Sequence, residues 1–236
     1  MCMIMNGAFL LCLLCFWTQR RVDAIDPGVL ASIIHDIKNV ANMNNQYAFA
    51  VDLQQEQCRQ QGLHDFGDNT NDIRNGLNGN TRMYLGQRVI TARPLFKETY
   101  TDHAEYRLLV TQQGHSPMAD LLERWRKEKS CTVFFTLYSP CGSKCTRPDH
   151  KYNILPYLNV FNNLDHNWVA FVFQDIFDYE LKHSTRKQML ALLQTIHENG
   201  GFIPVYRCPT GTKRCVDCMA DQDPMTNQCL DGMPLP

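Results

Sequence analysis

The sequence has no large excess of charge of either sign. Its 236 residues include 23 basic and 24 acidic side chains, so the formal net charge is −1. This balance excludes a strongly basic protein that coats nucleic acid, but it leaves room for a local basic groove. Apolar residues make up 44% and charged residues 20% of the chain, which excludes a fully disordered or fibrous protein. The length suits one domain, alone or with a small appendage.

Long hydrophobic runs are also missing. The apolar run over residues 7–17 is too short for a membrane-spanning helix, which needs about 18 residues or more. It is followed by Val22-Asp23-Ala24, with small or branched residues at the −3 and −1 positions of a cleavage site. We therefore predict a signal peptide over 1–24 and a secreted, extracellular chain with no membrane attachment after cleavage. The alternative is a membrane anchor or buried helix, because no Lys or Arg precedes the run.

Cysteine, by contrast, is abundant. The chain has 11 cysteines, which points to an oxidising compartment and agrees with secretion. Four of them fall in residues 208–236, a segment with turn-forming residues and little periodicity. We predict a main domain over 25–207 and a disulfide-held, cysteine-rich tail over 208–236.

Hydrophobic periodicity predicts an α/β fold. Helices are expected over 27–42, from near 102, over 116–129 and over 184–198, and strands over 47–53, 86–96, 131–138, 168–173 and 202–206. We expect a mixed central sheet of about five strands with helices on both faces. The first two strands are expected to pair as an extended hairpin. The polar segment 59–83 between them is interpreted as a long surface loop.

Two short motifs carry the chemistry. The letters HAE at 103–105 open one predicted helix, and PCGSKC at 140–145 directly follows a buried strand. With Ser139 as its N-cap, the second motif predicts a helix that places Cys141 and Cys145 on one face, near a terminus that favours thiolates. Together with His103, these thiolates supply three zinc ligands and leave a fourth tetrahedral position for water, as in catalytic zinc sites.

Glu105 is the candidate proton carrier. Zinc lowers the pKa of a bound water molecule toward about 7. A carboxylate beside that water can take its proton and pass it to a ring nitrogen and then to leaving ammonia. A non-ligand Glu in this position is part of the H-x-E…P-C-x-x-C signature of zinc deaminases.

The segments HAEYRLL and FFTLYSPCGSKC resemble the zinc-dependent cytidine deaminase superfamily, and within it the AID/APOBEC-like polynucleotide deaminases. The predicted signal peptide and the tail make the chain similar to a secreted branch of that group. The resemblance is strong over 103–145 and extends in element order over about 28–206. It implies a cytidine deaminase-like fold, one zinc ion per chain and catalysis by Glu105.

The sequence departs from the family pattern at two places. Three residues separate Cys141 from Cys145, where the commonest pattern has two. Tyr138 stands where many of these deaminases have Trp. The resemblance implies that Tyr138 stacks on the base and that Ser139 borders the pocket. It further suggests substrate contacts for Asn45, Phe177 and Tyr179.

The cysteines that remain after the metal ligands are removed are candidates for disulfides. These are Cys58, Cys131, Cys208, Cys215, Cys218 and Cys229, which allow 15 connectivities. The pair Cys215 and Cys218 is also compatible with a redox motif or half of a second zinc site, although a structural disulfide is favoured in a secreted chain. Basic residues over 124–129 are interpreted either as a patch that binds a phosphate backbone or as a solvated helix face.

The sequence therefore predicts a secreted zinc-dependent deaminase that converts cytosine to uracil in single-stranded DNA or RNA. Aromatic and basic side chains near the motifs favour a single strand, because bases stack on aromatic rings. The residues in question are Tyr100, Tyr138, Phe177, Tyr179, Lys97, Lys144, Arg147 and Lys151. The alternatives are a free cytidine or nucleoside deaminase, which the net charge favours, and a catalytically inactive, disulfide-stabilised binding protein.

Overall fold

The computed structural model describes residues 24–110 and 116–235. The predicted signal peptide lies outside the described residues, apart from Ala24. Nine strands are assigned in the described chain: β1 (Ala48–Gln54), β2 (Met83–Leu85), β3 (Val89–Ala92), β4 (Leu95–Phe96), β5 (Thr101–Asp102), β6 (Ser130–Tyr138), β7 (Val169–Asp175), β8 (Val205–Arg207) and β9 (Val216–Asp217). The α-helices are α2 (Pro27–Ala41), α3 (Thr70–Asn78), α4 (Ala104–Leu109), α5 (Pro117–Trp125), α6 (Asp178–His183) and α7 (Arg186–Asn199). Four short 3-10 turns complete the assignment: η1 (Gln57–Arg59), η2 (Leu155–Phe161), η3 (His166–Trp168) and η4 (Gln228–Leu230).

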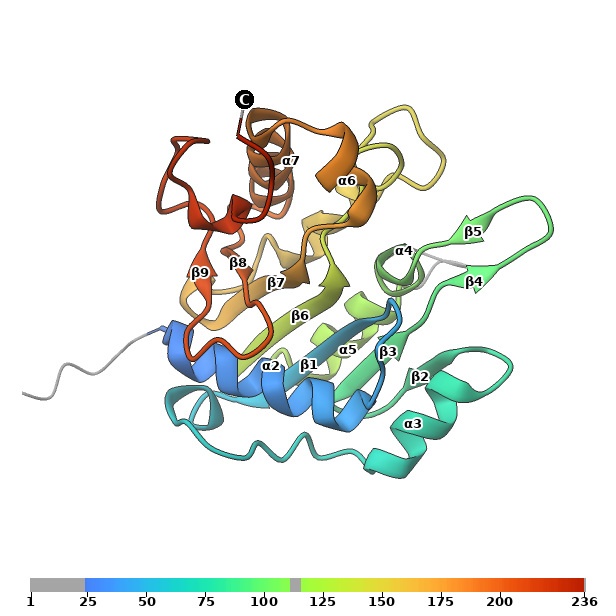
Figure 1. Ribbon diagram of the computed structural model, residues 1–236. Coiled ribbons are helices and arrows are strands. Elements are labelled where there is room, and N and C mark those ends of the chain that lie inside the picture. The colour runs from blue at the N-terminus through green and yellow to red at the C-terminus, as the bar shows by residue number, and fades with distance from the viewer. Residues whose placement is uncertain (1–23, 111–115, 236) are drawn as a thin grey trace, which may run out of the picture.

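Seven of the strands form one mixed sheet in the order β2-β3-β1-β6-β7-β8-β9 (Figure 1). β1 runs antiparallel to both β3 and β6, whereas β6, β7 and β8 are parallel. The α/β prediction is confirmed, but the sheet has seven strands rather than about five. The two extra strands, β2 and β9, lie at the edges of the sheet and are three and two residues long. Such short strands show no alternation in the sequence.

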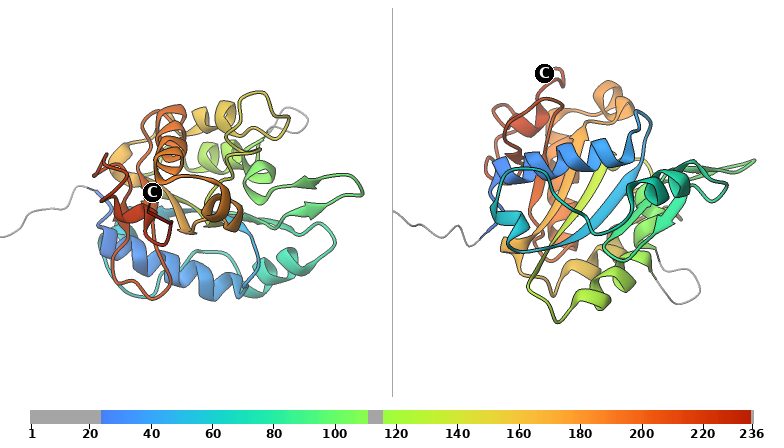
Figure 2. Two further views of the ribbon diagram at one scale, coloured as in Figure 1. Left: turned by 45° about the horizontal axis from the view of Figure 1, so that its top comes forward. Right: turned by 90° about the horizontal axis from the view of Figure 1, so that it is seen from below.

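Helices cover both faces of this sheet, as the sequence indicates (Figure 2). Neighbouring residues of β6 point to opposite faces, so each side has its own core. Phe135 belongs to the core beneath α2 and α3, where Ile33 is fully buried. Phe134 belongs to the core beneath α4, α5 and α7, and its ring stacks on that of Phe171. The long buried strands therefore form a rigid platform between two helical layers.

The predicted pairing of the first two strands is also confirmed, since Val51 of β1 lies opposite Val89 of β3. The segment between them is not all loop, however, because α3 lies within it. Asn69 caps this helix through its side chain, which accepts from the backbone N–H groups of residues 71 and 72. Only Ile73 and Leu77 of the helix are buried. Two apolar residues one turn apart are too weak a pattern to identify a helix within a polar segment.

The ribbon formed by β4 and β5 projects from the body of the molecule and leads into α4 (Figure 1). Both strands are only two residues long, and the side chain of Phe96 at the end of β4 is 67% exposed. The ribbon places its residues beside the start of α4, which carries the first chemical motif.

All six cysteines expected to form disulfides do so. The bonds join Cys58 to Cys131, Cys208 to Cys215, and Cys218 to Cys229. Because Cys215 and Cys218 belong to different disulfides, they form neither a redox pair nor half of a zinc site. The free cysteines of the described chain are Cys141 and Cys145.

The segment from Cys208 onward packs against the main sheet. Strand β9 pairs with β8, and the buried side chain of Arg186 donates to the backbone oxygens of Pro224, Asn227 and Leu230. Within residues 24–110 and 116–235, no helix has the length and apolar character needed to cross a membrane.

Candidate active site

His103 is held in place by the way α4 is anchored. It is the N-cap residue of this helix and has an extended backbone. One turn later, the buried Arg107 donates to the carbonyl oxygens of Thr81, Arg82 and Arg93, which fixes α4 against the chain around β2 and β3. The imidazole of His103 therefore leaves a rigid helix start and points toward the segment that follows β6.

That segment forms a turn and not the predicted helix. A helix would need the backbone N–H of Cys145 to bond the carbonyl oxygen of Cys141. Instead, this N–H donates to Cys141 Sγ at 3.4 Å, and the carbonyl of Cys141 accepts from the backbone N–H of Thr146. Ser139 does not act as an N-cap, because its hydroxyl accepts from the backbone N–H of Phe177. The turn nevertheless directs both thiols to one point.

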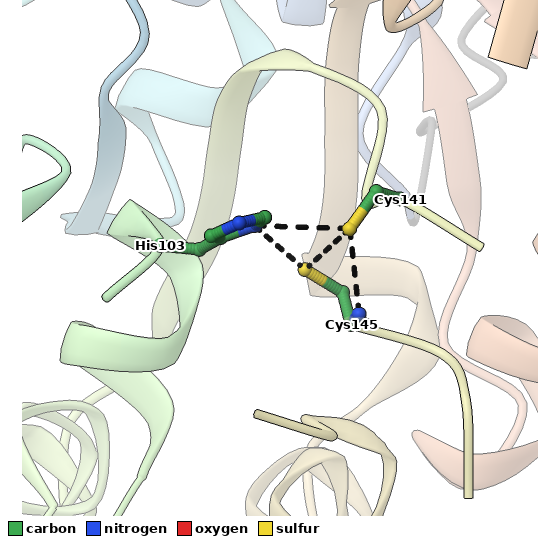
Figure 3. A group of neighbouring side chains, drawn as sticks. All are labelled: His103, Cys141 and Cys145. Atoms are coloured by element: carbon green, nitrogen blue, oxygen red, sulfur yellow. Dashed lines mark hydrogen bonds between the residues drawn. The ribbon is translucent and has the colours of Figure 1, made fainter. Parts of the chain in front are cut away.

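His103, Cys141 and Cys145 converge in a compact cluster (Figure 3). His103 Nδ1 lies 3.1 Å from Cys145 Sγ and 3.8 Å from Cys141 Sγ, and the two sulfur atoms are 3.4 Å apart. For Zn–S bonds of about 2.3 Å and a Zn–N bond of about 2.0–2.1 Å, a tetrahedron places its ligand atoms about 3.6–3.8 Å apart. The donor set and its spacing therefore fit a metal ion with soft ligands.

The pKa values of the two thiols are shifted in opposite directions. The hydrogen bond from Cys145 lowers the pKa of Cys141, and the nearby His103 lowers it further, while burial opposes them. The same bond and burial raise the pKa of Cys145. Burial lowers the pKa of His103, but its hydrogen bond with Cys141 and the charge of Glu105 outweigh burial and raise it. The lowered pKa of Cys141 favours its thiolate, which is the form that binds metals.

Glu105 lies in the first turn of α4 and is only 2% exposed. Its Oε1 atom accepts from the amide of Gln46 at 2.7 Å and from the hydroxyl of Thr136. Burial raises the pKa of Glu105, although the charge of His103 and the bond from Thr136 oppose this rise. A carboxyl group with a raised pKa is suited to gaining and losing a proton near neutral pH.

A cavity of about 260 Å³ opens onto these groups. His103, Glu105 and Cys141 line it together with Tyr138, Ser139 and Phe177. The rings of Tyr138 and Phe177 lie 6.3 Å apart at a tilt of 53°, so they form an aromatic wall. The cavity therefore combines a candidate metal centre, a buried carboxylate and aromatic surface.

A model of the family described as Secreted Novel AID/APOBEC-like Deaminase 1 matches residues 27–233. The chain belongs to this family. The match runs through the polar segment before β2 and through the cysteine-rich tail, beyond the 103–145 motif region. In the other two comparisons, no curated protein and no solved structure matches the chain. Membership in this secreted deaminase family confirms the resemblance, the fold class and secretion.

Not every residue that the deaminase resemblance suggested for substrate contact lies at the cavity. Asn45 is exposed and does not line it, whereas the next residue, Gln46, does. The amide of Gln46 also accepts from the backbone N–H of Tyr138 at 3.1 Å. No motif in the sequence marks Gln46, because its partners lie in β6 and α4. Tyr179 is 47% exposed, stacks on His183 and lines a separate cavity beside Glu180.

No motif in the sequence indicated that the segment around β4 borders the cavity at Glu105. Pro94 and Phe96 line one side of it. Neither belongs to a motif, and Phe96 looked like the end of a strand. Pro94 interrupts the strand pattern two residues before Phe96, and this break is the signal that could have identified the ribbon.

The basic residues near the cavity differ in their surroundings. Lys144 lines the cavity itself, and Lys151 lies 4.6 Å from the ring centroid of Tyr100. Arg147 pairs with Asp149 at 2.7 Å, and both side chains are exposed. Lys97 is exposed at the tip of the β4–β5 ribbon.

The basic segment at the C-terminal end of α5, residues 124–129, makes several contacts within the protein. The ring of Trp125 is covered by the guanidinium of Arg88 at 3.3 Å, Arg124 donates to the carbonyl of Gly86, and Arg126 pairs with Glu123. These contacts favour the interpretation as a helix face over that of a patch that binds a phosphate backbone.

Proposed function

We propose that this chain is a zinc-dependent hydrolytic deaminase that converts cytosine to uracil in single-stranded DNA or RNA. Membership in a deaminase family supports the reaction type. The observation that carries the proposal is the presence of Glu105 in the same cavity as His103 and Cys141. A metal-binding protein without catalysis has no need of a buried carboxylate there.

Zinc is the metal that best suits the cluster. Two thiolates and one imidazole form a three-ligand set of the kind found in catalytic zinc sites, which keep a fourth position open. Zinc bound by His103, Cys141 and Cys145 would act as a Lewis acid that makes water nucleophilic at neutral pH. The lowered pKa of Cys141 favours its thiolate, and Cys145, whose pKa is raised, would have to release its proton to bind the metal.

Glu105 moves the protons of the reaction. Hydrolysis of cytosine adds water at C4, breaks the C4–N bond and releases ammonia, so that a carbonyl group remains. The Glu105 carboxylate takes a proton from the attacking water, delivers it to the ring nitrogen N3, and then assists the departure of the amino group as ammonia. Gln46 and Thr136 both donate to Oε1 of this carboxylate and so hold it in position.

The shape of the cavity favours one base at a time. Tyr138 and Phe177 offer ring faces on which a flat pyrimidine packs, and Ser139 closes one side. A base inside a duplex must first leave its stack at a cost of a few kcal/mol, so a single strand is the preferred form. Phe96 and Lys144 at the rim can contact the neighbouring nucleotide and its phosphate.

A free nucleoside is the second candidate substrate. The cavity of about 260 Å³ admits cytidine as well as a base from a strand, and the net charge near zero gives no general attraction to phosphates. The choice between the two therefore depends on whether the rim residues contribute to binding.

The test measures uracil formation by the purified secreted chain from a single-stranded oligonucleotide, its duplex and free cytidine at equal cytosine concentration. We expect the single strand to react fastest. Faster reaction of free cytidine, with no gain from flanking nucleotides, would favour the nucleoside deaminase. Glu105→Gln keeps an oxygen acceptor for Gln46 and Thr136, so it should retain metal while losing the reaction. Equal product from this variant and the wild-type chain would contradict the assigned role of Glu105.

A further inference from the structure

The turn over residues 140–145, which carries both thiols of the cluster in Figure 3 and is called the metal turn below, is bonded from outside by a buried carboxylate. Glu180, in the first turn of α6, is only 3% exposed. Its Oε1 atom accepts from the backbone N–H of Gly142 at 2.7 Å, and its Oε2 atom accepts from the hydroxyl of Ser184. Each oxygen therefore has a donor, and one donor is the residue next to Cys141.

The peptide group between Cys141 and Gly142 is held at both of its ends. Its carbonyl oxygen accepts from the backbone N–H of Thr146 at 3.2 Å, and its N–H donates to Glu180. A peptide group is planar, so bonds at both ends fix the orientation of the whole plane. Because this plane begins at the Cα atom of Cys141, the two bonds also restrict the direction in which its thiol points.

The close packing of the metal turn on α6 and α7 depends on glycine at position 142. A Cβ atom there would lie 3.4 Å from each carboxylate oxygen of Glu180 and 3.3 Å from Leu192 Cδ1. Contacts this short would require the neighbouring side chains to shift. The absence of a side chain on Gly142 thus lets the carboxylate reach the backbone of the turn.

The charge of Glu180 is not compensated by a salt bridge. Within residues 24–110 and 116–235, no Lys, Arg or His side chain forms an ion pair with it. Burial of a carboxylate without a cation is costly, and an apolar side chain of similar volume often fills such a space at lower cost. The hydrogen bonds that the carboxylate makes therefore explain this position better than packing does.

The same short helix also carries part of the aromatic wall. Phe177 is the N-cap residue of α6 and lines the cavity at Glu105, and its backbone N–H donates to Ser139 Oγ at 3.1 Å. The backbone N–H of Ser139 in turn donates to the carbonyl oxygen of Asp175 at 2.8 Å. Together with the bond from Gly142, these contacts join residues 139–142 to residues 175–180 at three points.

We propose that Glu180 is a positioning residue of the metal turn, which holds the peptide group after Cys141 so that this thiol is directed at the metal. The effect depends on the length and hydrogen bonds of the side chain and not on its charge. The inference rests on the metal site of the proposed function, but it does not depend on deamination. Partners that orient metal ligands change metal affinity about 10- to 100-fold when they are mutated.

Two variants separate the position of the carboxylate from its charge. Glu180→Asp keeps the charge but is one methylene shorter, so it loses the bond to Gly142. Glu180→Gln keeps the length, an oxygen for the Gly142 N–H and an amide that can donate to Ser184. Competition of the purified full chain with a chromophoric chelator measures its affinity for zinc.

We expect Glu180→Asp to weaken zinc binding about 10- to 100-fold and Glu180→Gln to stay within about twofold of the wild-type chain. The matched control is Glu198→Asp, which shortens an exposed carboxylate in α7 and should not change the affinity. Equal affinity of Glu180→Asp and the wild-type chain would overturn the inference. Equal weakening by Glu180→Asp and Glu180→Gln would also overturn it, because charge would then be the cause.

Cobalt(II) in place of zinc gives a spectroscopic readout of the ligand geometry. The absorption bands of the bound ion depend on how the thiolates are arranged, so they should shift in Glu180→Asp and match the wild-type bands in Glu180→Gln. Wild-type bands in folded Glu180→Asp would show that Glu180 only stabilises α6, which would contradict the positioning role.

The failure of the metal site can be distinguished from the failure of this inference. A wild-type chain that binds no zinc would contradict the metal site and, with it, the role of Glu180. If Glu180→Asp does not fold, Ser184→Ala removes only the bond to Oε2 and should weaken zinc binding about fivefold. Unchanged affinity in Ser184→Ala would then overturn the inference.

Discussion

Gln46 and Glu105 meet across the candidate active site, with Gln46 Nε2 2.7 Å from Glu105 Oε1, although 59 positions separate them in the sequence. Gln46 also bonds the hydroxyl of Thr136 and the backbone N–H of Tyr138. One amide thus links the candidate proton carrier, the central strand β6 and the aromatic wall.

The first prediction concerns this amide. Gln46→Ala should lower kcat for deamination about 10- to 100-fold, because the Glu105 carboxylate loses a hydrogen bond worth about 1–3 kcal/mol. Metal content should stay the same, since Gln46 touches none of the three cluster residues. The matched control is Asn45→Ala, which changes an exposed neighbour. Steady-state kinetics and elemental analysis check both, and equal activity of the two variants would argue against the positioning role.

The second prediction concerns the metal. Elemental analysis of the wild-type chain should find one zinc ion per chain, and His103→Ala should remove most of it, because two thiolates alone leave the ion under-coordinated. His166→Ala, which changes an exposed histidine in η3, should retain the full amount. Unchanged zinc in His103→Ala would refute the assignment of this cluster.

The third prediction compares two disulfides. Cys58–Cys131 closes 73 positions of chain and Cys208–Cys215 closes seven. In the chain-entropy model the longer loop stabilises the fold by about 4 kcal/mol and the shorter by about 2 kcal/mol. Urea unfolding of the two double-alanine variants should therefore show the larger loss for Cys58/Cys131. A larger loss for Cys208/Cys215 would show that packing, and not loop length, determines the order.

The fourth prediction concerns pH. Burial raises the pKa of Asp52 to about 6, even though Thr132 and Ser130 donate to it and Arg88 lies 3.3 Å away. The folded state therefore holds this proton at pH values where the unfolded chain, with a pKa of about 4, has lost it. The resulting stability is fully present below about pH 4 and is lost as the pH rises through 6.

Asp52→Asn isolates this effect. The free energy of unfolding of the wild-type chain should fall by up to about 3 kcal/mol relative to the variant between about pH 4 and pH 7. Chemical denaturation at several pH values measures the difference. Parallel pH profiles for the two proteins would mean that the carboxyl group titrates alike in both states.

The sequence was sufficient to predict that His103, Cys141 and Cys145 come together near Glu105, because each lies in a short motif at a boundary of secondary structure. It did not predict the turn after β6, since the bond from Cys145 N–H to Cys141 Sγ depends on where the sulfur points. Gln46 was missed for a similar reason: its partners come from β6 and α4, which only the folded sheet brings together. Short elements with few apolar residues, such as α3 and β9, also leave no periodic pattern.

Strand β9 has a consequence for how molecules of this chain behave toward one another. It is the last strand of the sheet, only two residues long, and it lies directly between Cys215 and Cys218, which belong to different disulfides. An open sheet edge is a place where a second chain can add a strand and begin aggregation. Because the flanking disulfides prevent this edge from lengthening, we expect them to limit edge-to-edge association between molecules of this chain.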